Sequence, residues 1–339
     1  TETATSFENE RQKVEISLVK SIEQNERFDI GTNGEMKNIT FGLFSAEEIV
    51  STSGTFIPAD GLIEIVSLNE DGTATIKTDL PYGRYYVQEI ATDSHYKLSD
   101  AKYPIIFEYV GQYTAVVKIS VNDGKAIKND LIYGSVSGKK VDEDGNALGG
   151  AMIGLFRTDD GEFTKENALM TTTSAEDGSF SFENIPCGTW YVREIEQPTG
   201  FVLDDTIYPV TIGTDGQVVE IEIVNEYGRG NIHLTKVDSE YPDNKLTGAV
   251  FEVYKDSNNN SKLDEGDELL GTLTEKEIGE YGMNDLFYGR YFVKETKAPD
   301  GFVLDTDVYE VVIDTDGKTY LYGRSRLRTD QLQGHHREI

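Results

Sequence analysis

A short block of aromatic and β-branched residues with one glutamate recurs three times in this chain of 339 residues. The copies are 85–89 (YYVQE), 190–194 (WYVRE) and 291–295 (YFVKE), each shortly after a turn that contains glycine. Residues of these types suit a pleated, half-buried surface, so each copy predicts a β-strand. Because side chains alternate along a strand, the glutamate shares a face with the first and third residues of its block. Either this face is solvated and carries an aromatic stripe, or a carboxylate lies inside a core three times.

The spacing of these blocks predicts three domains. Their glutamates, Glu89, Glu194 and Glu295, are 105 and then 101 residues apart. Around each glutamate lie short apolar runs separated by Asp-Gly and similar turn signals, which is the pattern of a β-sandwich. We therefore expect an all-β chain of three tandem Ig-like β-sandwich domains, joined by segments too short to act as flexible linkers. The expected domains are 1–133, 134–229 and 230–320.

Composition excludes several classes of function. The formal net charge of −30, from 61 acidic against 31 basic residues, would repel nucleic acid and anionic membrane surfaces. No apolar run approaches the length of a membrane-spanning helix and no signal region opens the sequence, so we expect a soluble protein or a fragment of a longer exported one. Cys187 is the single cysteine and cannot form an internal disulfide. The segment 321–339 is basic and non-periodic, and is expected to be a disordered or non-native tail.

Lysine and asparagine recur at fixed places around the joints between repeats. Asn129 and Asn225 each lie eleven residues before the lysine of the following repeat, which indicates that the two asparagines are equivalent. Asn122 is a lesser candidate that reads better as part of a turn. In the third repeat the matching position is Arg326, so the asparagine is missing there. The lysines that end the three opening strands are Lys20, Lys140 and Lys236.

Lysine at the end of the first strand, glutamate in an aromatic strand and asparagine in the last strand form an ordered pattern. The pattern resembles the CnaB/SpaA-type prealbumin-like repeats of Gram-positive surface proteins and pilins, over residues 11–320. It is strongest in the second and third repeats, where a Phe-Val-Leu-Asp string recurs at 201–204 and 302–305. The first repeat departs from it, with 91–96 in place of this string. The resemblance implies a prealbumin-like sandwich on the outside of a Gram-positive cell, in the cell wall.

The resemblance also implies a Lys–Asn isopeptide bond within a domain, formed without a cofactor and promoted by the glutamate. The chemistry suits these residues, because burial lowers the pKa of a lysine and raises that of a glutamate. A neutral amine is a nucleophile, and a protonated glutamate can polarise the carboxamide and move protons as ammonia leaves. The alternative is a buried Lys–Glu ion pair with asparagine at a sheet edge, which is weak support for stability. The implied sets are Lys20 with Glu89 and Asn129, Lys140 with Glu194 and Asn225, and Lys236 with Glu295 but no asparagine.

An acidic loop in the third repeat resembles a calcium-binding loop of the Asp-x-Asn-x-Asn kind. Ser261 stands where such loops have glycine, and Asp267 where they have a bidentate glutamate. Two interpretations remain open, calcium binding and a solvated acidic hairpin loop. The implied ligands are Asp256, Asn258, Asn260, Asp264 and Asp267.

These features predict a structural stalk or pilin-like segment of a Gram-positive cell-surface protein, as part of a longer chain. The alternative is an adhesin module in which loops or tyrosine-rich surfaces of the first repeat bind a host protein or glycan. A domain that reacts once with itself is not an enzyme. The sequence shows no nucleophile set, phosphate loop or zinc spacing, and its four histidines form no constellation, which argues against a hydrolase.

Overall fold

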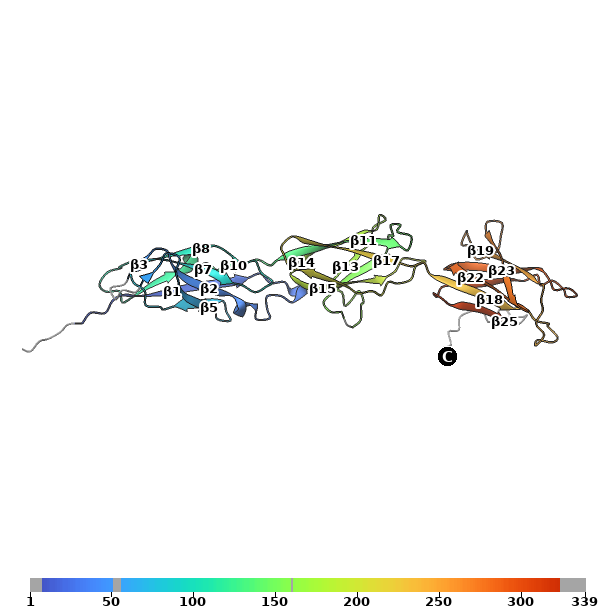
Figure 1. Ribbon diagram of the computed structural model, residues 1–339, viewed down its shortest axis with the longest axis horizontal. Coiled ribbons are helices and arrows are strands. Elements are labelled where there is room, and N and C mark those ends of the chain that lie inside the picture. Colours follow the sequence, from blue (N-terminus) through green and yellow to red (C-terminus); the bar gives the residue numbers. More distant parts are fainter. Residues whose placement is uncertain (1–7, 51–55, 160, 324–339) are drawn as a thin grey trace, which may run out of the picture.

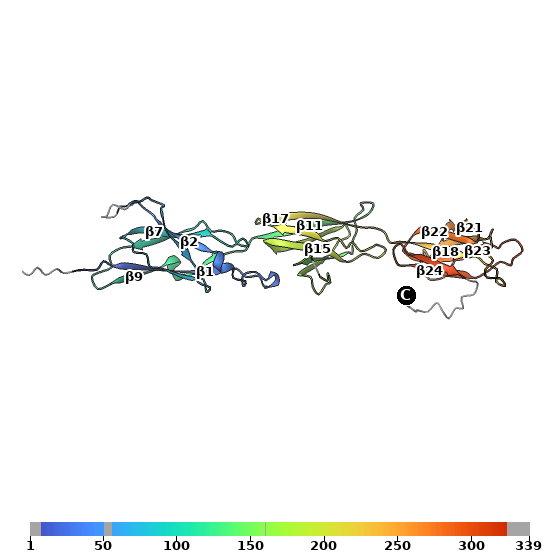
Figure 2. The same cartoon turned by 60° about the horizontal axis from the view of Figure 1, so that its bottom comes forward.

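The computed structural model describes residues 8–50, 56–159 and 161–323. Three β-sandwich domains follow one another end to end along the long axis of the molecule (Figure 1). A view from another side shows the same extended arrangement (Figure 2). The prediction of an all-β chain of tandem sandwiches is confirmed.

Domain 1 contains two sheets, one short hairpin and three short 3-10 helices. One sheet is built on β1 (Lys13–Ile22), which is antiparallel to β6 (Thr73–Ile76) and parallel to β9 (Val116–Ser120) and β10 (Ile127–Asn129). The other has the order β5 (Leu62–Ser67), β2 (Thr40–Ser45), β7 (Gly83–Ala91) and β8 (Lys102–Phe107). The hairpin is β3 (Ile49–Val50) with β4 (Phe56–Ile57), and the helices are η1 (Glu26–Phe28), η2 (Glu35–Asn38) and η3 (Val121–Gly124).

Domain 2 has the simplest form of the sandwich. Its first sheet has the order β14 (Ser179–Pro186), β11 (Tyr133–Asp142) and β17 (Gln217–Asn225). Its second sheet has the order β13 (Met170–Thr173), β12 (Met152–Phe156), β15 (Gly188–Glu196) and β16 (Tyr208–Ile212).

Domain 3 repeats this topology with one additional edge strand. Its first sheet has the order β21 (Thr274–Glu277), β22 (Glu280–Phe287), β18 (Arg229–Thr235) and β25 (Thr319–Gly323). Its second sheet has the order β20 (Glu268–Thr272), β19 (Val250–Lys255), β23 (Gly289–Lys297) and β24 (Val308–Ile313).

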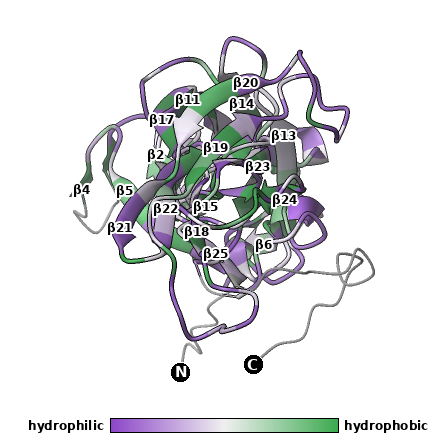
Figure 3. Ribbon diagram, turned by 90° about the vertical axis from the view of Figure 1, so that its right-hand side faces the viewer, coloured by the Kyte–Doolittle hydropathy of each residue, from purple (hydrophilic) through white to green (hydrophobic). Residues whose placement is uncertain are grey.

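Each domain buries the inward-facing side chains of its two sheets. In domain 2, for example, Val136 of the first sheet and Val192 of the second are both fully buried. The alternation of buried and exposed residues along these strands is the one expected when a sheet has one face in the core. In a view along the long axis, the peripheral loops are mostly hydrophilic, and the hydrophobic residues lie mainly in the strands (Figure 3).

The first and last strands of every domain are parallel neighbours, which brings distant parts of the sequence together. Asn129 pairs with Ile22, and Asn225 pairs with Asp142, so each asparagine lies opposite the residue two positions after the lysine. In domain 3, β18 and β25 pair in the same way.

The end of domain 3 differs from the expectation. The strand β25 reaches Gly323, although the sequence pattern placed the end of the domain at residue 320. The physical reason is the alternation of Tyr320 and Tyr322, whose rings both pack against the core and extend the strand. Arg326, the position that matches Asn225, lies outside the described residues, as does the rest of the expected tail from 324 onward.

The two joints between domains use the same backbone hydrogen bonds. In both, two successive carbonyl oxygens accept hydrogen bonds from two turns of the following domain. They belong to the first residue of that domain's opening strand and to the residue before it. The pairs are Cys187 to Ile132 (2.8 Å) and Gly216 to Tyr133 (2.7 Å) at the first joint, and Tyr288 to Gly228 (2.8 Å) and Gly317 to Arg229 (2.8 Å) at the second.

The first joint has a further contact from an insertion in domain 1. Phe28, in η1, packs edge-on against Trp190 of domain 2 at 4.8 Å between ring centroids. Arg157 of domain 2 donates a hydrogen bond of 2.8 Å to the carbonyl oxygen of Phe28. Aromatic contact and a charged hydrogen bond restrict movement of the two domains about this joint.

Candidate functional site

The three block glutamates lie inside their domains rather than on a solvated face. Glu89 is 3% exposed, and Glu194 and Glu295 are 1% exposed. They come from β7, β15 and β23, which belong to the sheet that faces the first strand. Of the two interpretations of the blocks, the structure shows the second, in which each of the three domains encloses the carboxylate in its core.

The aromatic residue that starts each block fixes the turn before it. Its polar atom donates a hydrogen bond to the carbonyl oxygen four residues earlier, which anchors the beginning of the glutamate strand. The three bonds are Tyr85 to Pro81 (2.7 Å), Trp190 to Pro186 (2.9 Å) and Tyr291 to Phe287 (2.6 Å).

In domain 1 the structure brings Lys20, Glu89 and Asn129 into direct contact. Lys20 Nζ lies 2.5 Å from Asn129 Oδ1 and 3.5 Å from Glu89 Oε2. Asn129 Nδ2 donates to Glu89 Oε1 at 2.6 Å and to the hydroxyl of Thr92 at 2.9 Å. One carboxyl oxygen therefore faces the lysine and the other faces the amide nitrogen. Asn122, the lesser candidate, lies in the turn η3 and is not part of this group.

In domain 2 the glutamate again lies beside both the lysine and the asparagine, but among the described residues Asn225 Oδ1 has no hydrogen-bond partner. Lys140 Nζ lies 3.9 Å from Glu194 Oε1 and donates a hydrogen bond of 3.1 Å to the carbonyl oxygen of Ile223. Asn225 Nδ2 donates to Glu194 Oε2 at 2.6 Å and to the carbonyl oxygen of Val202 at 2.5 Å. Again one carboxyl oxygen faces the lysine and the other faces the amide.

Burial shifts the protonation of these groups toward their neutral forms. Both lysine side chains are fully enclosed, and removal from water lowers the pKa of Lys20 and of Lys140, against the opposing charge of the nearby glutamate. Burial also raises the pKa of Glu194, although hydrogen bonds from Asn225 and the Asp204 backbone act in the opposite direction. A neutral amine beside a protonated carboxyl group is the arrangement that nucleophilic attack on an amide requires.

Domain 3 contains only part of this arrangement. Lys236 Nζ lies 2.8 Å from Glu295 Oε1, and the Lys236 side chain is 17% exposed, whereas the other two lysine side chains are fully buried. No asparagine of the described chain contacts this pair. The closing position, Arg326, is outside the described residues.

The sequence patterns missed several groups that contact the sites. Thr92 holds the amide nitrogen of Asn129 in domain 1, and the Val202 carbonyl group does so in domain 2. The backbone N–H of Asp204 donates to Glu194 Oε2 at 2.8 Å. The recurring Phe-Val-Leu-Asp string was the available signal for the last two, but a repeated string does not reveal that its backbone groups enter a site.

The acidic loop of domain 3 gathers four of the five implied calcium ligands. Asn258 Nδ2 and Asn260 Nδ2 donate to the two oxygens of Asp264, at 3.0 and 2.5 Å, while Asp256 accepts the backbone N–H of Asn260 at 3.1 Å. Ser261 adopts the left-handed conformation, with φ 62°, that glycine would provide at this position.

Two charged residues reduce the capacity of this loop for a cation. Both oxygens of Asp267 accept backbone N–H groups, from Ser257 at 3.1 Å and Asp264 at 3.0 Å, so this carboxylate closes the loop. Arg290 Nε lies 3.3 Å from Asp256 Oδ2. Within the described ranges, no group of three or more His, Cys, Asp or Glu side chains could by itself hold a metal ion. The carboxylate and amide oxygens nevertheless have the chemistry that calcium prefers.

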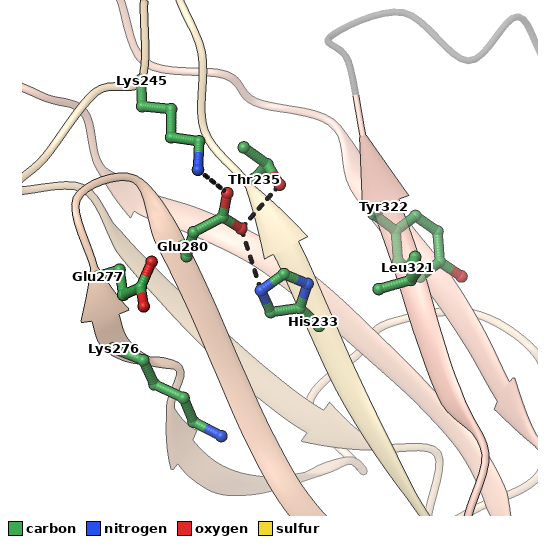
Figure 4. Close-up of a pocket in the computed structure, with 8 residues that line it drawn as sticks. All are labelled: His233, Thr235, Lys245, Lys276, Glu277, Glu280, Leu321 and Tyr322. Atoms are coloured by element: carbon green, nitrogen blue, oxygen red, sulfur yellow. Dashed lines mark hydrogen bonds and ion pairs between the residues drawn. The ribbon is translucent and has the colours of Figure 1, made fainter.

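A separate polar cluster lines a hollow on domain 3 (Figure 4). Glu280 accepts hydrogen bonds or ion pairs from His233 at 3.0 Å, Lys245 at 2.6 Å and Thr235 at 2.8 Å. Both carboxyl oxygens of Glu280 are therefore paired within the cluster. The cluster shares no residue with the Lys236–Glu295 pair.

The fold and the buried Lys–Glu pairs define a class of protein, tandem β-sandwich domains of the prealbumin-like type. The family model of the SpaA prealbumin-like fold domain matches three segments, 24–125, 134–227 and 230–325. The chain therefore belongs to this family. A comparison with functionally curated proteins found no match.

Several solved structures have a similar fold at low sequence identity. The Bacillus anthracis TIE protein is 21% identical, with a TM-score of 0.57, and the match covers 92% of this chain but 50% of that one. The chain thus spans half the length of that protein. BcpA, the major pilin subunit of Bacillus cereus, is 19% identical (TM-score 0.40; 93% and 100% of the two chains), and a streptococcal ancillary pilin is 20% identical (TM-score 0.30; 92% and 100%).

No helix in the part of the chain that the structure describes is long and apolar enough to cross a membrane.

Proposed function

We propose that domains 1 and 2 each form one intramolecular Lys–Asn isopeptide bond, between Lys20 and Asn129 and between Lys140 and Asn225. The observation that carries this proposal is the enclosed contact in domain 1, where Lys20 Nζ lies 2.5 Å from Asn129 Oδ1 and Glu89 contacts both. A buried ion pair alone is costly to desolvate, and nothing in its energetics explains an asparagine in the same place twice.

The reaction balances without a cofactor. The neutral lysine Nζ attacks Cγ of the asparagine, a C–N bond forms, and the C–Nδ2 bond breaks. The glutamate is protonated at the start and gives its proton to the carboxamide oxygen as Nζ attacks. It then takes a proton from Nζ and passes it to the departing nitrogen, and it recovers its first proton when the carbonyl re-forms and ammonia leaves. The glutamate ends in its starting state, and the products are a secondary amide and one molecule of ammonia per domain. Because each domain changes itself once, the protein is not an enzyme.

Intact mass tests this proposal directly. We expect the purified chain to be lighter than its sequence mass by two molecules of ammonia. Glu89→Gln and Glu194→Gln keep the side-chain shape but remove the titratable proton, so each should restore one ammonia. Asn122→Ala, in a turn outside the site, is the matched control and should leave both losses in place. A mass equal to that of the plain sequence contradicts cross-linking in both domains.

At the level of the whole molecule, we propose a stalk or pilin-like segment of a Gram-positive cell-surface protein. Three sandwiches arranged end to end, joints held by paired backbone hydrogen bonds and a strongly acidic surface suit a soluble spacer outside the cell. Cross-links between the first and last strands would let such a spacer resist extension. Extracellular labelling of intact cells that express the parent protein tests the location, and protection from the label would contradict it.

A second candidate function is an adhesin module at the end of domain 1 that is distant from domain 2. Tyr109 and Tyr113, in the loop between β8 and β9, are 61% and 94% exposed. Gln12 fixes this loop by donating to the carbonyl oxygens of Gly111 and Thr114, both at 2.7 Å. Exposed aromatic rings on a fixed loop suit a protein or glycan surface. Binding to a glycan or host-protein array that is lost in a Tyr109→Ala, Tyr113→Ala double variant would favour this function.

A further inference from the structure

The Phe-Val-Leu-Asp string of domain 2 contributes two backbone groups to the Lys140–Glu194–Asn225 site. The N–H of Asp204 donates to Glu194 Oε2 at 2.8 Å, and the carbonyl oxygen of Val202 accepts from Asn225 Nδ2 at 2.5 Å. Neither group belongs to the three residues that react. Both are brought to the site because the N–H of Val202 donates to the carbonyl oxygen of Glu226, beside the last strand, at 2.9 Å.

The side chain of Asp204 keeps its own backbone in place. Its Oδ1 accepts the N–H of Thr206 at 3.0 Å, and its Oδ2 accepts the hydroxyl of Tyr208 at 2.7 Å. These two bonds close a turn of the kind that aspartate favours. The direction of the Asp204 N–H toward Glu194 thus depends on the Asp204 carboxylate and on Tyr208.

Domain 3 shows that this arrangement does not require the asparagine. Asp305 N–H donates to Glu295 Oε2 at 2.7 Å, and Asp305 accepts from Tyr309 at 2.6 Å and from the N–H of Asp307 at 3.0 Å. The geometry is that of domain 2, although no asparagine among the described residues contacts Glu295. The string therefore orients the glutamate independently of the acceptor.

The bonds to Glu194 Oε2 determine where its proton can lie. This oxygen accepts two hydrogen bonds, from Asp204 N–H and from Asn225 Nδ2, so it has no room for a proton of its own. The proton of neutral Glu194 must then lie on Oε1, which is 3.9 Å from Lys140 Nζ and has no hydrogen-bond partner among the described residues.

We propose that Asp204 is a positioning residue for isopeptide formation in domain 2. It directs the Glu194 proton to the oxygen that faces Lys140. The inference rests on the proposed cross-linking function. Asp204 touches neither reacting atom and acts through its N–H on Glu194 and through its charge. Although burial raises the pKa of Asp204, hydrogen bonds from Thr206 and Tyr208 lower it more, so the carboxylate remains charged and opposes ionisation of Glu194.

Domain 1 reaches the same contacts by another route and provides an internal reference. Thr92 Oγ1 accepts from the amide nitrogen of Asn129 at 2.9 Å, as the Val202 carbonyl group does in domain 2. Within the described residues no backbone N–H contacts Glu89. Changes at Asp204 should therefore alter ammonia loss in domain 2 and leave domain 1 unaffected in the same molecule.

The test follows ammonia loss over time in freshly translated full-length chain, with samples digested so that each cross-linked peptide is assigned to its domain by mass. We expect Asp204→Ala to slow the reaction of domain 2 by about tenfold or more relative to domain 1, the effect of losing one hydrogen bond to a carboxyl group in the transition state. Asp204→Asn retains the acceptor for Thr206 and should recover most of the rate. As pH is raised, the rate of this variant should begin to fall at a lower pH than the rate of the wild type, because the charge that keeps Glu194 protonated is gone.

A matched variant separates positioning from folding. Asp305→Ala removes the same contacts in domain 3, where no reaction is expected, so its effect on domain melting measures the structural cost alone. If Asp204→Ala prevents domain 2 from folding, Tyr208→Phe removes a single hydrogen bond to Asp204 and should still slow the reaction. Equal rates in the wild type and in the folded variants would overturn the positioning role. Absence of ammonia loss from domain 2 of the wild type would instead overturn the cross-linking function.

Discussion

Lys20 Nζ lies 2.5 Å from Asn129 Oδ1, although 109 residues separate them in the sequence. They meet because β1 and β10, near the two ends of domain 1, are parallel neighbours. A covalent bond here would close nearly the whole domain into one loop. Such a loop restricts the unfolded chain as a disulfide does.

We therefore predict that Asn129→Ala lowers the free energy of unfolding of domain 1 by about 5 kcal/mol, the entropy of a closed loop of about 100 residues. Calorimetry of the full chain should show one transition moving down while that of domain 2 stays in place. Asn122→Ala changes an asparagine of the same domain outside the site and should have little effect. In limited proteolysis the wild-type domain 3 should be cut first, and survival of domain 3 after loss of domain 1 or 2 would contradict the assigned bonds.

A second prediction concerns pH and uses Asn225→Ala, which leaves Lys140 unreacted. Burial lowers the pKa of Lys140 in the folded state below its ordinary value of 10.5, so the unfolded chain binds more protons between these two values. The stability of the variant domain should rise as pH increases through this window. If the proposed bond forms in the wild type, the same nitrogen is an amide there and does not titrate.

The difference in melting temperature between wild-type domain 2 and Asn225→Ala should therefore narrow from neutral pH toward pH 10.5. Glu194 acts in the opposite direction at lower pH. Burial raises its pKa above 4.5, so its contribution to stability is lost as pH rises through the raised value, in both proteins. Calorimetry at a series of pH values measures both effects. A melting-temperature difference that stays constant up to pH 10 would contradict the proposed bond, because Lys140 would then titrate alike in the two proteins.

The sequence was sufficient to predict the sandwich fold and the residues that meet in the sites, but not the groups that hold them. Glu89 and Glu194 could be found because strand periodicity places them on the face of buried aromatic residues. Thr92 and the Asp204 N–H could not, because a loop backbone has no periodicity that marks its direction. The extension of β25 through Tyr322 was missed for a related reason, since a basic composition suggested an end where two tyrosines continued the packing.

A third prediction tests the incomplete site of domain 3. Lys236 and Glu295 are already 2.8 Å apart, and the Asp305 N–H holds the other oxygen of Glu295. Arg326→Asn places an acceptor at the position that matches Asn225, and we expect it to produce a third loss of ammonia in intact mass. Arg328→Asn offers the same residue two positions later and should not react. If Arg326→Asn reacts no better than Arg328→Asn, the spacing inferred for the closing strand is wrong.

The last prediction concerns calcium and the loop between Asp256 and Glu268. We expect calcium to bind through the oxygens of Asp256, Asn258, Asn260 and Asp264, which the loop already gathers. A ligand that binds only the folded state stabilises it by about 2.7 kcal/mol at one hundred times its dissociation constant. Calcium should thus raise the melting temperature of domain 3 alone, and more than magnesium does, because magnesium demands a smaller and more regular shell.

Asp264→Asn should abolish the shift, whereas Asp243→Asn, which changes an exposed aspartate elsewhere in domain 3, should preserve it. If calcium moves no transition, the loop is a solvated acidic hairpin in which Arg290 and the loop's own N–H groups neutralise Asp256 and Asp267.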